Sequence, residues 1–82
     1  MTREIITSQI QDIARVVFDK PELLLTNTLS AVDVDTWTSL SFMQLLSEIE
    51  KKFGFKFKMM EILKLQNMGA IIEAILQHVN NA

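Results

Sequence analysis

The chain has 82 residues, enough for one folded domain, and its 49% hydrophobic and 22% charged residues predict a folded rather than disordered protein. With no cysteine and one histidine, it lacks the side chains for disulfide bonds, thiolate metal sites and sites built from several imidazoles. Its formal net charge of −2 argues against a nucleic-acid binder, because phosphate neutralisation supplies most of the affinity of such proteins.

The sequence predicts neither a membrane span nor an export signal. No uninterrupted apolar run exceeds three residues, whereas a spanning helix needs about 20. Residues 1–4 lack the apolar core of a signal peptide. We therefore expect a single cytoplasmic domain over residues 1–82, present as a monomer.

The first predicted helix ends before Pro21, because the residue before a proline is disfavoured in the α region. Its apolar stripe at helical spacing consists of Ile6, Ile10, Ile13, Ala14 and Val17. A long connection follows over residues 22–37. A free loop would expose its apolar residues to water, so we expect an ordered loop that lies across the core. The apolar residues of this connection are Leu23, Leu24, Leu25, Leu29 and Val32.

The second predicted helix has the clearest pattern. Thr38 is expected to cap it, Ser39 to be its first residue, and Gly54 to close it in the left-handed conformation. Lys51 and Lys52 fall in the last turn, where cations suit the helix dipole. One apolar stripe runs along the helix and comprises Phe42, Leu45, Leu46, Ile49 and Phe53.

The remaining residues predict a short extended piece and two more helices. Phe55 and Phe57 alternate with Lys56, so both rings should turn inward. A short helix is expected over residues 58–63, with some of Met59, Met60, Ile62 and Leu63 packing on the bundle. Asn67 should cap a last helix that carries Met68, Ile71, Ile72, Ile75 and Val79, and residues 80–82 should form a frayed tail. The predicted fold class is all-α: a small four-helix bundle, three longer helices plus one short helix, with a long ordered loop between helices one and two.

The start of the second helix has residues that the core does not explain. A helical projection places Leu40 and Met43 off the buried face and Ser39 at its border with solvent. Apolar side chains beside an exposed serine suggest a docking surface. The alternative is that Ser39 merely starts a helix and Leu40 touches the long loop.

The run Asp35-Thr36-Trp37-Thr38-Ser39-Leu40 and the segment over residues 48–57 resemble the acyl carrier protein family. That family shows a D-S-L motif at the start of its second helix, often preceded by Trp, and an "IE..FG..F" run after it. The resemblance covers the whole chain: one helix, a long loop, the serine helix, a short helix and a last helix.

The resemblance implies that Ser39 carries a covalent 4′-phosphopantetheine arm, installed from coenzyme A by a phosphopantetheinyl transferase. The arm would hold acyl intermediates as thioesters for fatty-acid, polyketide or peptide-type biosynthesis. The chain would present them to acyl-loading, acyl-transferring or condensing enzymes and would not itself be an enzyme, so no catalytic residue is expected. The absence of cysteine fits, because the reactive sulfur arrives with the arm.

The residues expected to meet partner enzymes lie on and just before the serine helix: Trp37, Leu40, Met43, Ser47, Glu48 and Glu50. A lone Trp in an ordered loop more often packs on its own core. The methionines Met59, Met60 and Met68 could likewise fill gaps in a small core.

Two features depart from the family pattern. Thr38 stands where the family usually has Asp; a hydroxyl can still cap the helix, but the lost carboxylate puts recognition by the transferase in question. Helix two is also less acidic than in many members, and five lysines lie within residues 51–64. They are either an ordinary solvated face or the sign of a dedicated partner with a mixed or acidic surface.

Two other functions compete with the carrier hypothesis. The chain could be a helical interaction module that is not phosphopantetheinylated, in which case Leu40 and Met43 would matter and Ser39 would not. It could also be a nucleic-acid binder that uses residues 57–63 beside the lysines, which the net charge of −2 disfavours. His78 has no second histidine or cysteine beside it, so we expect neither a metal site nor a catalytic base.

Overall fold

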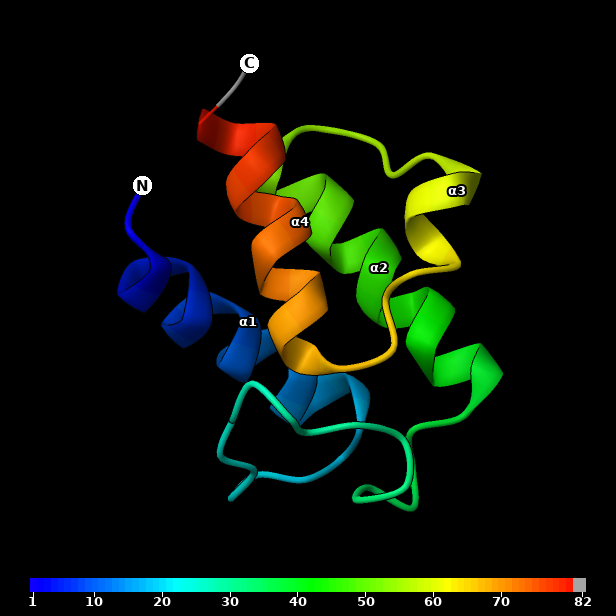
Figure 1. Cartoon of the computed structure of the whole chain (residues 1–82). Helices are drawn as coiled ribbons and strands as arrows, with labels where there is room; N and C mark the ends of the chain where they lie inside the picture. Colours follow the sequence, from blue (N-terminus) through cyan, green and yellow to red (C-terminus); the bar gives the residue numbers. More distant parts are fainter. Residues whose placement is uncertain (81–82) are drawn as a thin grey trace.

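Four α-helices make up the fold. The computed structural model describes residues 1–80 and contains α1 (Arg3–Val17), α2 (Ser39–Phe53), α3 (Met59–Ile62) and α4 (Met68–Asn80). α1 packs against both α2 and α4, while the short α3 lies at the edge of the bundle (Figure 1). No strand occurs within these residues, so the predicted all-α bundle is confirmed.

The core is built from the apolar stripes of the three long helices, as the helical spacing predicted. Each fully buried aliphatic side chain contributes roughly 1.5–3 kcal/mol by leaving water. The buried helix residues are Ile6, Ile10, Ala14, Leu45, Leu46, Ile49, Met68, Ile71, Ile72 and Ile75. Phe18, one residue beyond the predicted stripe of α1, is also fully buried. Phe42 and Phe53 of the α2 stripe are only partly buried.

The helix ends follow local chemistry. The Thr2 hydroxyl accepts a hydrogen bond from the N–H group of Ile5 and so caps α1. α1 ends at Val17, and Asp19 then takes a left-handed conformation with φ of 54° before the proline. Gly54 closes α2 at φ of 76°, as expected for a glycine in this position.

The long loop between α1 and α2 is ordered, but only some of its apolar residues reach the core. Leu23, Leu25 and Leu29 pack partly against it, and Val34 is buried. Leu24 and Val32 are exposed, which corrects the expectation that all five apolar residues would lie on the core. The exposure of Leu24 between the partly buried Leu23 and Leu25 is the alternation expected of an extended segment, whereas Val32 lies in a turn.

Hydrogen bonds from the helices hold this loop in place. The Nε of Arg15 donates to the carbonyl of Leu23 over 2.8 Å, and the Gln11 amide oxygen accepts from the N–H group of Leu25 over 3.0 Å. At the other end, Gly69 of α4 donates its N–H group to the Asn27 carbonyl over 2.9 Å. A Cβ at position 69 would lie only 2.7 Å from that carbonyl oxygen, so this contact requires glycine. The loop is therefore fixed to both α1 and α4.

The last elements differ slightly from their predicted bounds. The segment before α3 turns both Phe rings inward, with Phe57 buried, Phe55 partly buried and their centroids 4.9 Å apart. α3 is shorter than the predicted residues 58–63. Asn80, predicted as part of a frayed tail, is the last residue of α4, and its side-chain oxygen accepts a hydrogen bond from the Met1 amino group. The rest of that predicted tail, residues 81–82, lies outside the described residues.

Candidate functional site

Ser39 is the first residue of α2, and its side chain is exposed. Its hydroxyl forms no hydrogen bond with any group in residues 1–80. The backbone N–H groups of Ser39 and Leu40 also lack an acceptor there, as is usual in the first turn of a helix. A free hydroxyl therefore lies beside unpaired N–H donors, which is a favourable setting for a phosphate group.

A reciprocal pair of hydrogen bonds explains why Ser39 is free. The Thr38 hydroxyl accepts from the Ser41 N–H group over 3.2 Å, and the Ser41 hydroxyl accepts from the Thr38 N–H group over 2.8 Å. Ser41 also donates its hydroxyl to the Thr36 carbonyl over 2.7 Å and is buried. Thr38 and Ser41 thus cap α2 between them, as a capping box does, and leave Ser39 out of the structural network.

A groove of about 520 Å³ opens beside Ser39. Its apolar surface comes from Trp37, Phe42 and Leu65, and Gln66 adds a polar edge. The groove lies between the start of α2, the loop before it and the connection between α3 and α4. Its remaining lining residues are Ala31, Thr38 and Ser39. An apolar chain attached at Ser39 could therefore leave water partly by lying in this groove.

Three of the residues predicted to meet partners form an exposed stripe on α2. Leu40, Met43 and Ser47 follow one another at spacings of three and four, so they share one side of the helix. The Leu40 and Met43 side chains are 72% and 52% exposed. The exposed Glu48 lies next to this stripe, and its carboxylate is 3.7 Å from the Lys51 ammonium group.

Two other residues predicted to meet partners have structural contacts, and for Trp37 packing on the core was already the favoured expectation. Trp37 is only 9% exposed and stacks on the rings of Phe18 and Phe42, with centroid distances of 5.0 and 6.2 Å. The Glu50 side chain is 19% exposed, and its carboxylate accepts the Phe57 N–H group over 2.8 Å. Both side chains are held by the fold itself, so neither offers a partner much surface.

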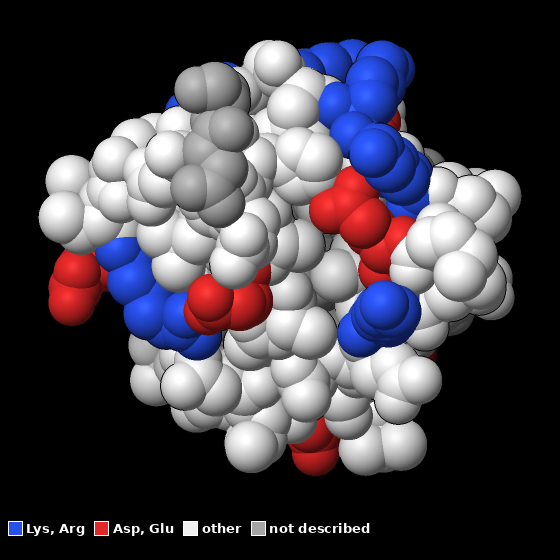
Figure 2. Space-filling model, turned by 45° about the horizontal axis from the view of Figure 1, so that its top comes forward, with Lys and Arg blue, Asp and Glu red and all other residues white. Residues whose placement is uncertain are grey.

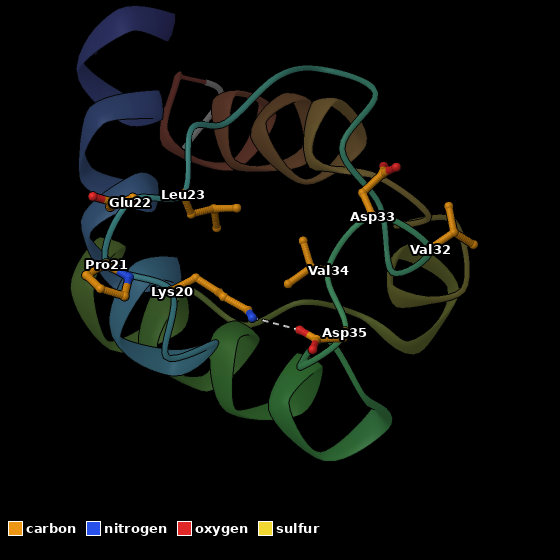
Figure 3. A pocket seen from close by; sticks show the side chains of 8 residues that line it. All are labelled: Lys20, Pro21, Glu22, Leu23, Val32, Asp33, Val34 and Asp35. Atoms are coloured by element: carbon orange, nitrogen blue, oxygen red, sulfur yellow. Dashed lines mark ion pairs between the residues drawn. The ribbon is translucent and has the colours of Figure 1, made fainter.

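A larger hollow, of about 730 Å³, lies between the two ends of the long loop and does not include Ser39. Figure 3 shows Lys20 reaching across it to Asp35, and the two charged groups are 2.8 Å apart. The Lys20 ammonium group, by its hydrogen bond and its charge, lowers the pKa of the Asp35 carboxyl. Leu23 and Val34 point into the space between the two segments (Figure 3). This ion pair joins the two ends of the loop, and Ser39 does not line the hollow that it crosses.

His78 is part of a structural contact. Its Nε2 atom lies 2.7 Å from a carboxylate oxygen of Glu61, and its ring stacks on Phe55 at 4.2 Å. Glu61 also accepts the Lys58 N–H group over 2.8 Å; this bond, more than the His78 contact, lowers the pKa of Glu61 against the opposing effect of burial. Residues 1–80 contain no cluster of three or more side chains suited to hold a metal ion.

No helix within the described part of the chain has the length and apolar character needed to cross a bilayer.

Sequence reasoning missed the structural role of Ser41 and the paired role of Glu61. The spacing of Thr38 and Ser41, three residues apart at a helix start, was an available signal, although the usual partner residue there is Glu or Gln. The contact between Glu61 and His78 joins residues 17 apart in the chain and has no local signal. It depends on how α3 and α4 pack.

Comparisons with known proteins identify a family and a similar solved structure. A family model described as "Phosphopantetheine attachment site" matches residues 4–75. Among solved structures, the chain is similar to the solution NMR structure of holo acyl carrier protein from Geobacter metallireducens, with 33% identity and a TM-score of 0.86. That similarity covers 92% of this chain and 86% of the other. No curated protein matches the chain. The range matched by the family model includes Ser39 and every residue that lines the groove beside it.

Proposed function

Because this chain belongs to the acyl carrier protein family, whose covalent cofactor is 4′-phosphopantetheine, we propose that Ser39 is the attachment site and that the arm carries acyl groups. The observation that carries this proposal is the free, exposed hydroxyl of Ser39 at the start of α2. Ser41, two residues away, is buried and bonded to Thr38 and Thr36, so its modification would break the cap of α2.

Loading is a phosphoryl transfer from coenzyme A. The Ser39 oxygen attacks the phosphorus atom next to the pantetheine, a new O–P bond forms, and the bond to the adenosine bisphosphate breaks. The serine proton goes to a base of the transferase, and the bisphosphate leaves with the electron pair. The unpaired N–H groups of Ser39 and Leu40 would stabilise the resulting phosphodiester at the positive end of the helix dipole.

The terminal thiol of the bound arm supplies the chemistry, since it holds an acyl group as a thioester. The chain's own contribution is to bind the arm, present it and shelter apolar cargo in the groove of Trp37, Phe42 and Leu65. We assign it the role of a carrier domain without catalytic activity, monomeric and cytoplasmic, in fatty-acid, polyketide or peptide-type biosynthesis. Its partners are then a phosphopantetheinyl transferase and the enzymes that load, transfer or condense acyl groups.

We assign contact with those enzymes to the exposed stripe of Leu40, Met43 and Ser47, together with Glu48. Its support is the exposure of two apolar side chains within four residues of the attachment serine. Apolar contacts of Leu40 and Met43 would stabilise the complex with a partner enzyme. The Ser47 hydroxyl and the Glu48 carboxylate would orient that complex.

The proposal is tested by incubating the purified chain with coenzyme A and a transferase of broad specificity and then measuring its intact mass. We expect a gain of one phosphopantetheinyl group in the unmodified sequence and none in Ser39→Ala. Ser8→Ala, which removes another exposed serine on α1, away from the assigned contact stripe, is the control and should gain the same mass.

A gain in Ser39→Ala would place the arm elsewhere. No gain with any transferase tested, including those of the native host, would contradict loading and favour the second candidate function, an interaction module without the arm. Thr38 in place of the family's Asp is the observation that favours this second function. It predicts that Leu40→Asp weakens partner binding while Ser39→Ala leaves binding unchanged.

A further inference from the structure

The polarity of α3 is the reverse of that expected for a helix at the edge of a bundle. Its three outward side chains are apolar: Met59, Met60 and Leu63 are 70%, 67% and 64% exposed. The one acidic residue of the helix, Glu61, is instead partly buried, as is Ile62. Soluble domains place single apolar side chains on their surface freely, but three large ones within five residues form a continuous patch.

Two contacts fix this orientation of α3. The Glu61 carboxylate accepts the Lys58 N–H group over 2.8 Å at the start of the helix. It also contacts the His78 ring of α4 over 2.7 Å. Ile62 packs against the core on the same side. Rotating α3 to bury its methionines would break the contacts of Glu61, so the apolar side chains are held in solvent.

Cations are concentrated in the part of the sequence that contains this apolar patch. Residues 51–64 hold five of the eight Lys and Arg side chains of the chain and only one of the ten Asp and Glu side chains. Residues 1–50, by contrast, hold three cationic and eight acidic side chains. Figure 2 shows one group of basic side chains at the upper right, with acidic side chains and a further basic group below it, and a separate basic group at the lower left. The molecule therefore has a strong charge asymmetry despite its small net charge.

Most of these lysines remain available to a partner. Lys52 and Lys64 form no ion pair within residues 1–80. Lys51 and Lys56 lie 3.7 and 3.9 Å from the carboxylates of Glu48 and Glu50, and both lysines are exposed. Exposed pairs at such distances are weak and are readily exchanged for other partners.

We propose that the outer face of α3 is a docking surface for a protein partner that presents an apolar surface bordered by acidic side chains. The surface on this chain consists of Met59, Met60 and Leu63 with Lys58 and Lys64 at its two ends, and we call it the α3 patch. Methionine side chains adapt their shape to an apolar surface, and the lysines match carboxylates at its edge. The patch does not involve Ser39, so it stands whether or not the chain is loaded.

Charge and length favour a protein over a membrane as the occupant. Helices that bind the surface of a bilayer bury a long apolar face, whereas α3 has a single turn of four residues. The net charge of −2 also opposes attraction of the whole molecule to anionic lipids. Three apolar side chains with flanking cations match instead the small apolar centre and polar rim of a transient protein interface.

NMR titration of the unloaded full chain tests the proposal with two synthetic helical peptides that have the same apolar residues. One peptide carries Glu at its polar positions and the other carries Lys. We expect the acidic peptide to shift the amide resonances of residues 58–64 in a saturable manner, and more weakly as salt is added. The basic peptide should leave them unchanged.

Variants of exposed residues separate charge from apolar contact without disturbing the fold. Lys58→Gln combined with Lys64→Gln should weaken binding of the acidic peptide by roughly threefold to tenfold. Met60→Gln should weaken it to a similar extent, whereas Val16→Gln, at a still more exposed apolar position on α1, should have no effect.

Several results would overturn the proposal: no shift with the acidic peptide, shifts outside the α3 patch, or equal shifts with both peptides. Binding of the patch to vesicles of phosphatidylcholine and phosphatidylglycerol, without a response to the acidic peptide, would assign it to lipid. Shifts of residues 58–64 that depend on protein concentration alone would assign it to a second copy of the chain.

Discussion

Thr38 and Ser41 each accept a hydrogen bond from the backbone N–H group of the other, over 3.2 and 2.8 Å. This reciprocal contact caps α2 and leaves the serine between them, Ser39, exposed and unbonded. Ser39 and Ser41, two residues apart, thus have different roles. Ser41 holds the helix start in place, and Ser39 is available for modification.

Ser41→Ala should destabilise the fold without preventing loading. The substitution removes the acceptor of the Thr38 N–H group and the donor to the Thr36 carbonyl, which costs about 1–2 kcal/mol. For a domain of this size each kcal/mol lowers the melting temperature by about 4–8 °C. Thermal unfolding measures the loss, and Ser39→Ala, which breaks no hydrogen bond, should melt as the unmodified chain does. Equal melting temperatures for both variants would contradict the assigned roles.

Thr38→Asp should speed loading by a transferase of broad specificity while keeping the fold. An aspartate can also accept the Ser41 N–H group, and its charge suits the N-terminus of α2. It restores the carboxylate that the family usually presents beside the serine. We expect the initial loading rate to rise by about tenfold, equivalent to about 1.4 kcal/mol of recognition.

Thr38→Asn is the matched control, because it caps the helix equally well without a charge. Its loading rate should stay near that of the unmodified chain. Equal rates for the Asp and Asn variants would show that the carboxylate is not what the transferase recognises.

Gly69→Ala should loosen the long loop from α4. The added Cβ would lie 2.7 Å from the Asn27 carbonyl oxygen, so the backbone must shift, at a cost of roughly 1–3 kcal/mol. The Gly69 amide donates to that carbonyl, so its hydrogen-exchange rate should rise in the variant. The rate of global unfolding should rise as well. Gly54→Asn tests a glycine with open space around it; asparagine tolerates φ of 76°, so this variant should lose far less stability. A larger loss at position 54 would contradict the steric argument.

The Glu61 contact makes the order of α3 sensitive to acid. The pKa of Glu61 is lowered in the folded chain, mainly by the Lys58 N–H group, so its stabilising contribution is complete above the ordinary value near 4.5. This contribution is lost as the pH falls through the lowered pKa. We expect the NMR signals of residues 58–63 to broaden in that range while those of α1 stay sharp. Glu61→Gln should abolish this local transition, and a transition that persists in the variant would assign it to another group.

The three long helices could be predicted because their periodicity is local: apolar residues at helical spacing determine which side is buried. The position of Ser39 followed from the same pattern together with the capping residue Thr38. For Trp37 the sequence only favoured packing on the chain's own core, and for Glu50 it could not tell whether the side chain would face a partner. The burial of Trp37 depends on rings from α1 and α2, and that of Glu50 on the Phe57 N–H group after the turn at Gly54.

The long loop and α3 show the same limit. Leu24 and Val32 look like core residues in sequence, but both are exposed in a loop that Arg15 and Gly69 hold through the carbonyls of Leu23 and Asn27. Likewise, Met59 and Met60 resemble core residues until the contact between Glu61 and His78 fixes α3 with its apolar side outward. Such contacts join residues that are distant in sequence, so the local spacing of apolar residues does not predict them.

Mass spectrometry of the protein isolated from its native host shows whether Ser39 carries the arm. We expect an intact mass raised by one phosphopantetheinyl group, free or acylated, with fragmentation placing the modification on Ser39. A protein found only unmodified, or modified at Ser41, Ser47 or elsewhere, would rule out Ser39 as the attachment site.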